Sequence, residues 1–122
     1  MNIVLLFSHI LTDPQEKELK ERYRCENIIY MPEELKKIWM NVDDTTSAEP
    51  FKNFLLKNLN KGDYVLIQGE WGLTFQLVNF ALDNGFVPLF SRTTRDVKEE
   101  KKGDEVVRIS VFRHLGFRKY ER

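Results

Sequence analysis

The chain has 122 residues, 42% of them hydrophobic and 31% charged, with 19 basic and 19 acidic side chains. This composition predicts one globular domain, residues 1–122, that buries a core without disulfides, and it excludes a disordered chain. A formal net charge of zero argues against a protein that coats long nucleic acids. The longest apolar run, Ile3 to Phe7, is too short to span a membrane, and no secretory signal is visible, so we expect a cytoplasmic protein.

The first half of the chain alternates predicted strands and helices. Asn2–Phe7 is a continuous apolar run, as expected for a buried parallel strand. A helix is predicted next, with Asp13 as its cap, Pro14 at its first position and Glu16 completing a capping-box-like set. A short second strand is predicted at Asn27–Met31, and the segment PEELKKIWMNV is expected to form a helical turn or two.

The second half repeats this alternation and ends in a predicted hairpin. Pro50–Leu59 is predicted to be a helix and Tyr64–Gln68 a third strand. An amphipathic helix then leads to a fourth strand at Val87–Phe90. Arg95–Glu100 and Glu105–Phe112, separated by KKGD, have the pattern of an antiparallel hairpin. The alternation is typical of an α/β fold with a mostly parallel sheet, and right-handed crossovers favour the strand order 2-1-3-4. The hairpin would extend one edge of this sheet or project from it.

Two loops are predicted to face each other where the winding of the sheet reverses. In an open α/β sheet this is where ligands bind, beyond the carboxyl ends of the strands. One loop, FSHIL, carries Ser8 and His9; the other, QGEWGLT, runs from the third strand into a helix. Its glycines permit close approach of a ligand and its helix start favours an anion, so the loop suits a phosphate. The candidate ligand-binding residues of this loop are Gln68, Gly69, Glu70, Trp71, Gly72 and Thr74.

A purely structural interpretation of the QGEWGLT loop also stands. Gly69 and Gly72 would then merely permit a tight turn, with Trp71 as an apolar lid. The loop lacks both the GxGxxG and the P-loop pattern, so nothing in it identifies a dinucleotide or a nucleoside triphosphate. No spacing suggests a metal site or a hydrolase nucleophile elbow, and we expect neither a metal nor a cofactor.

The remaining chemistry lies in two histidines and a basic C-terminal part. His9 and His114 each lie near a predicted strand end and can transfer protons near neutral pH, although packed or solvent-facing histidines are common. The segment SRTTR follows the fourth strand, where hydroxyls beside arginines suit phosphate or ribose; the alternative is a polar loop leading into the hairpin. From Val106 onward five Lys and Arg face one Glu, which suits a small anion or is a solvated basic tail. The candidate ligand-binding residues here are Arg92, Thr93, Thr94, Arg95 and Arg118.

The lone Cys25 is expected to be a small, partly buried thiol.

Four blocks of the sequence together resemble a known family. LLFSHILT, YMPEELKKIW, KGDYVLIQGEWGLTFQLVNFA and VFRHLGFRKYE are similar to the small CRISPR-associated accessory proteins of the Csx-twenty type, found with type III CRISPR systems. The resemblance covers nearly the whole chain. It implies a single Rossmann-like domain related to the CARF domains that sense cyclic oligoadenylates. The implied activity is that of a ring nuclease, which opens cyclic tetra-adenylate and so switches off an antiviral signal.

The resemblance also implies a mechanism and an assembly. Cyclic tetra-adenylate would bind across a two-fold homodimer, because ligand and dimer share rotational symmetry. Cleavage would need no metal: a ribose 2′-OH attacks the adjacent phosphate, the QGEWGLT loop holds that phosphate and the arginines after the fourth strand neutralise it. The catalytic candidates are His9, His114 and Ser8. Two alternatives stay open: a non-catalytic module that senses or sequesters cyclic oligoadenylate, and an α/β protein that binds an unrelated nucleotide.

Overall fold

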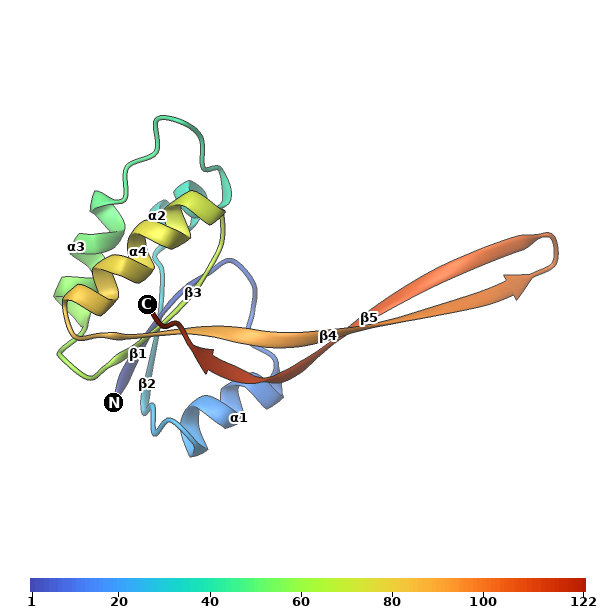
Figure 1. The fold of residues 1–122 in the computed structure, drawn as a ribbon, viewed down its shortest axis with the longest axis horizontal. Coiled ribbons are helices and arrows are strands. Elements are labelled where there is room, and N and C mark those ends of the chain that lie inside the picture. The colour runs from blue at the N-terminus through green and yellow to red at the C-terminus, as the bar shows by residue number, and fades with distance from the viewer.

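Five strands form one sheet with helices on both of its faces (Figure 1). The computed structural model describes residues 1–122. The strands are β1 (Asn2–Phe7), β2 (Asn27–Tyr30), β3 (Tyr64–Gln68), β4 (Val87–Lys102) and β5 (Glu105–Lys119). Their order is β2-β1-β3-β4-β5; the first four are parallel, and β5 pairs antiparallel with β4. The predicted α/β class and the strand order 2-1-3-4 are confirmed, and the hairpin both extends one edge and projects from it.

The helices bury the two faces of the sheet in separate apolar clusters. They are α1 (Asp13–Glu21), α2 (Glu33–Met40), α3 (Glu49–Asn58) and α4 (Trp71–Asp83). Helix α1 covers the face to which Ile3 and Leu5 point, whereas α2, α3 and α4 cover the face of Val4 and Leu6. This division follows from the alternation of side chains along a strand, and it buries β1 on both sides. None of the four helices combines the length and the apolar character needed to cross a membrane.

Helix α1 starts at Asp13, one residue earlier than predicted, because its cap is the preceding residue. Thr12, not Asp13, is the N-cap, and its hydroxyl accepts a hydrogen bond from the N–H of Gln15 at 3.4 Å. The Gln15 side chain returns the contact by accepting from the N–H of Thr12 at 2.9 Å, which completes a capping box. Glu16, predicted to play that part, instead pairs with Lys20 at the surface. The buried Gln15 side chain also contacts β4, through the Ser91 hydroxyl.

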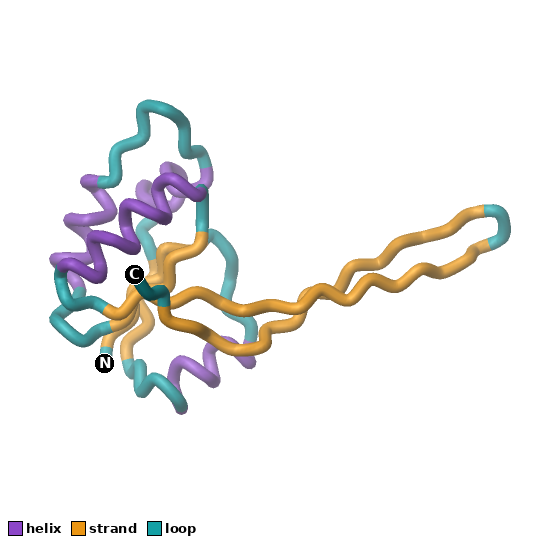
Figure 2. Tube along the Cα trace, in the orientation of Figure 1, coloured by secondary structure: helices purple, strands orange, loops and turns teal.

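The predicted fourth strand and the first strand of the predicted hairpin are one continuous strand. SRTTR is therefore the middle of β4 rather than a loop, and β5 continues past its predicted end to Lys119. The outer parts of β4 and β5 form a long two-stranded ribbon that stands away from the helices (Figure 2). A bulge at Arg92/Thr93 shifts the register, and Gly116 beside it has a φ of +143°, a conformation that favours glycine.

Candidate functional site

A crevice of about 470 Å³ opens at the carboxyl ends of β1 and β3, beside β4. This is the place in the sheet where the sequence predicted a ligand site. Aromatic rings and amides dominate its walls. The crevice is lined by Phe7, His9, Gln15, Gln68, Ser91, Thr93 and Phe112.

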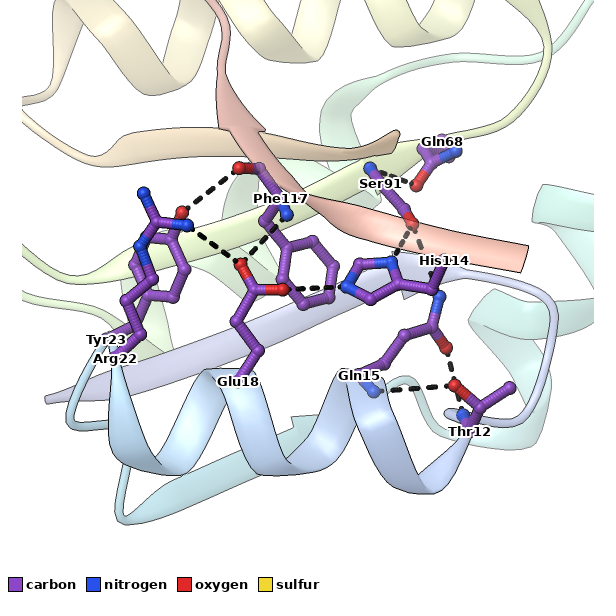
Figure 3. Close-up of polar contacts among 9 residues, drawn as sticks. All are labelled: Thr12, Gln15, Glu18, Arg22, Tyr23, Gln68, Ser91, His114 and Phe117. Atoms are coloured by element: carbon purple, nitrogen blue, oxygen red, sulfur yellow. Dashed lines mark hydrogen bonds and ion pairs between the residues drawn. The ribbon is translucent and has the colours of Figure 1, made fainter. Parts of the chain in front are cut away.

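A chain of hydrogen bonds joins β4, β5 and α1 at the wall of this crevice (Figure 3). The Ser91 hydroxyl lies 2.7 Å from Nδ1 of His114, and Nε2 of the same ring lies 2.7 Å from Oε1 of Glu18. Only 8% of the His114 side chain is exposed, and 15% of that of Glu18. The histidine is thus shielded from solvent and reaches the crevice through Ser91.

The carboxylate of Glu18 is fixed by contacts on both of its oxygens. While Oε1 faces His114, Oε2 accepts a hydrogen bond from the N–H of Phe117 at 2.9 Å. Nη1 of Arg22, the residue that follows the end of α1, lies 3.5 Å from the same Oε2. The ring of Phe117 also packs against the imidazole, with centroids 4.7 Å apart. These contacts hold both partners of the His114–Glu18 pair in place.

The proton positions in this chain follow from the chemistry of its members. An ionised Glu18 can only accept, so Nε2 of His114 donates to it. In the neutral ring Nδ1 is then an acceptor, and the Ser91 hydroxyl donates to it. The Ser91 oxygen in turn receives a 3.4 Å contact from Nε2 of Gln15. A hydroxyl that donates to a histidine backed by a carboxylate is the arrangement by which proteins activate serine.

The second histidine lies in the crevice wall without this support. His9 follows β1, is exposed, and meets the ring of Phe7 edge-on with centroids 5.2 Å apart. It also borders a neighbouring cavity of about 250 Å³ that reaches Tyr30 and Lys36. Ser8 is half-buried and is not part of the crevice lining. The structure therefore brings His9 and His114 to the same crevice in two different environments, one exposed and one shielded.

The negatively charged group at the start of α4 is a side chain of the protein itself, the carboxylate of Glu70. Both carboxylate oxygens of Glu70 accept hydrogen bonds, from the N–H of Gly72 at 2.9 Å and that of Leu73 at 2.8 Å. The N–H groups of Leu73 and Gly72 hold the pKa of Glu70 below its ordinary value. The groups that the sequence assigned to a phosphate are thus already occupied.

The rest of the QGEWGLT loop divides between packing and another surface. A Cβ on Gly69 would lie 2.5 Å from the ring of Trp39, so this glycine gives room to a buried tryptophan. Trp71 is 90% exposed and, with Thr74, borders a different cavity on the outer side of α4. Gln68 alone among the loop candidates lines the crevice, where its Oε1 accepts from the N–H of Ser91 at 2.8 Å.

The candidates on β4 and β5 fall on two faces of the ribbon. Thr93 shares the crevice face with Ser91, and the guanidinium of Arg95 on the same face bonds the Ser110 hydroxyl at 3.1 Å. Arg95 also lies over the ring of Phe112. Because strand side chains alternate, the remaining candidates lie on the opposite face. These are Arg92, Thr94 and Arg118.

Sequence reasoning placed Ser91 in the SRTTR segment near the predicted crevice, but it missed Gln15, Glu18 and the contact of Ser91 with His114. Gln15 and Glu18 are three residues apart and share the face of α1 that points to the sheet, which is a detectable helical signal. An acid in a short charged helix nevertheless has the pattern of a solvated surface residue. No group of three or more His, Cys, Asp or Glu side chains is arranged to hold a metal ion.

Comparison with known proteins identifies the family of this chain. The model of the uncharacterized protein MJ1673 family matches residues 1–118. The uncharacterized protein MJ1673 of Methanocaldococcus jannaschii is 42% identical over 121 residues, which covers 95% of this chain and 94% of that protein. The chain therefore belongs to the MJ1673 family. No solved structure matches it.

Proposed function

We propose that this member of the MJ1673 family is a ring nuclease with a Rossmann-like, CARF-related fold. As a homodimer it would bind cyclic tetra-adenylate and open it by metal-independent phosphodiester cleavage, which would end type III CRISPR signalling. The observation that carries this proposal is the Ser91–His114–Glu18 chain at the wall of a crevice beyond the strand ends. It supplies a proton acceptor at the place where an α/β sheet binds its ligands.

The crevice has groups suited to a nucleotide with a bridging phosphate. The rings of Phe7 and Phe112 offer faces on which adenine can stack. The amides of Gln15 and Gln68 offer hydrogen bonds to base edges or phosphate oxygens. Arg95, held over Phe112, brings a positive charge close to that wall. Together these groups favour a purine nucleotide over a small apolar ligand.

The proposed reaction removes one proton from the attacking 2′-oxygen and delivers one proton to the leaving 5′-oxygen. The ribose 2′-oxygen attacks the adjacent phosphorus, the O2′–P bond forms and the P–O5′ bond breaks, leaving a 2′,3′-cyclic phosphate and a 5′-OH. The 2′-OH proton passes to the Ser91 oxygen as the Ser91 proton moves to Nδ1 of His114, and Glu18 stabilises the imidazolium. His9, exposed at the crevice, donates a proton to the leaving 5′-oxygen.

The test is incubation of the protein with labelled cyclic tetra-adenylate in EDTA. The wild-type chain should yield linear products. Ser91→Ala should slow single-turnover cleavage by about 10²–10⁴-fold, because the path to His114 is broken, while the affinity changes little. Thr94→Ala is the matched control, since Thr94 lies on the opposite face of β4 and should leave the rate unchanged. Binding without cleavage would favour a module that sequesters the cyclic nucleotide. The absence of binding would favour a protein that binds an unrelated nucleotide.

A further inference from the structure

The outer parts of β4 and β5 form a ribbon that meets the rest of the chain at its base, where His114 contacts Glu18 of α1, and then stands away from it. Beyond the bulge this ribbon, residues 93–114, is here called the arm; Figure 1 shows it pointing away from the helices. A two-stranded ribbon is only marginally stable in water on its own. The two strands of the arm nevertheless stay paired as far as Lys102 and Glu105. Such a structure needs a surface to pack against.

One face of the arm carries an apolar strip suited to that packing. Val107, Ile109 and Val111 alternate along β5 and so point to the same side, where Ile109 is 40% and Val111 44% exposed. Their register partners on β4 are Glu100, Lys98 and Asp96. This arm strip is therefore a narrow apolar surface bordered by charges of both signs.

Helix α4 has a second apolar stripe, which is largely exposed at Trp71 and Phe75. Leu73, Leu77 and Ala81 are buried against the sheet. Trp71 and Phe75, spaced by one helical turn on another side, are 90% and 70% exposed. These two, with the half-buried Val78, border a cavity of about 340 Å³ that the C-terminal residues also line.

The composition of α4 supports the same conclusion. Its 13 residues include no Lys or Arg and a single acid, Asp83. A helix that is apolar on more than one side is normally covered on more than one side. The stripe of Trp71, Phe75 and Val78, here called the α4 stripe, thus has the character of a contact surface.

We propose that two copies of this chain exchange arms, the arm strip of each packing on the α4 stripe of the other. The arm strip cannot cover the α4 stripe of its own chain, because the arm leads away from the helices (Figure 2). A two-fold axis brings each strip to the other chain's stripe and makes the contact twice.

Area favours this exchange over a pairing of two arms, and charge does not oppose it. The arm strip is only about 15 Å long, so strip-to-strip contact would fall far short of the roughly 800 Å² per partner that stable complexes bury. In the exchange, each chain buries its α4 stripe in addition to its arm strip. The arm carries six Lys and Arg and five Asp and Glu, and α4 carries a single acid, so no block of like charges opposes the contact.

The mass of the wild-type protein and of four variants, measured by light scattering over a concentration series without nucleotide, tests the exchange. Ile109→Lys and Phe75→Lys should each raise the dissociation constant of the dimer by about 10²-fold, because each buries an unpaired charge at both symmetry-related contacts. Val97→Lys, on the other face of the arm, and Gln76→Lys, on the next side of α4, are the controls and should leave it unchanged. All four side chains are exposed or at the surface, so circular dichroism should show folded variants.

Mixing the two disrupted variants distinguishes exchange from any other dimer. The Phe75→Lys chain keeps an intact arm and the Ile109→Lys chain an intact α4 stripe, so the mixture should form a heterodimer with one good contact. A wild-type protein that stays monomeric, or a mixture that fails to associate, would overturn the proposal. Because no nucleotide is involved, the result is independent of whether the chain cleaves cyclic tetra-adenylate.

Discussion

His114 and Glu18 are 96 residues apart in the chain, yet Nε2 of the ring lies 2.7 Å from Oε1 of the carboxylate. The contact is formed because β5 is the edge strand beside β4 and its His114 and Phe117 face α1, where the N–H of Phe117 also donates to the Glu18 carboxylate. It orients the imidazole toward Ser91 and sets the tautomer in which Nδ1 can accept a proton. The proposed chemistry therefore depends on a helix residue that never reaches the crevice itself.

Replacing Glu18 tests this positioning role. We expect Glu18→Gln to slow single-turnover ring opening by about 10²-fold with little change in affinity, because an amide cannot stabilise the imidazolium as a carboxylate does. The affinity should stay unchanged because Glu18 acts through His114 and does not line the crevice. The measurements are the single-turnover rate and the dissociation constant of cyclic tetra-adenylate in EDTA.

Glu16→Gln is the matched control for this experiment. Glu16 lies two residues away on the same helix but pairs only with Lys20 at the surface. Its substitution should leave both the rate and the affinity unchanged. An equal loss in the two variants would show that the effect comes from α1 stability rather than from the contact with His114.

The sheet could be predicted from the sequence because its signals are local. The apolar run Asn2–Phe7 and the run Tyr64–Gln68 identify two central strands by themselves, and the helices between strands fix a parallel order. The extent of the hairpin could not be predicted in this way. Polar residues such as Arg92 and Thr94 have the pattern of a loop, and only their pairing with β5 makes them part of a strand.

The candidate site shows the same division between local and long-range information. The crevice position follows from the topology, and His9 follows from its place after β1. The contact between Ser91 and His114 depends on the register of β4 and β5, which a bulge shifts by one residue. No pattern in the neighbouring sequence specifies that shift.

Gly69 should be the glycine least tolerant of substitution near the site. A Cβ there would lie 2.5 Å from the ring of Trp39, which is buried and cannot move away cheaply, so Gly69→Ala should lower the free energy of unfolding by about 2–3 kcal/mol. At Gly72 the nearest atom is the exposed carboxylate of Glu70 at 3.2 Å, and Gly72→Ala should cost much less. Urea unfolding of both variants checks the difference. Equal losses at the two positions would contradict the packing role of Gly69.

The carboxylate of Glu70 decides whether the start of α4 binds an anion. Because the N–H groups of Leu73 and Gly72 lower its pKa, Glu70 stabilises the fold while ionised, and this stabilisation is lost as the pH falls through the lowered value. Glu70→Ala should remove the cap and make stability less dependent on acid pH. Ring opening should stay unchanged, since these N–H groups do not line the crevice. A large gain in affinity for cyclic tetra-adenylate would instead place a phosphate at this helix start.

Cys25 should make the protein less stable at alkaline pH. Burial raises the pKa of its thiol from 9.0 to about 11, and only 1% of the residue is exposed. As the pH rises from about 9 to about 11 the unfolded chain loses this proton while the folded chain keeps it, so the free energy of unfolding falls in that interval. Cys25→Ala should flatten this part of the curve, measured by urea unfolding at each pH. The ionisation of Tyr23 and Tyr120, whose pKa values burial also raises, should leave a residual slope in both proteins. An identical pH dependence in the two proteins would show that the thiol is not the group responsible.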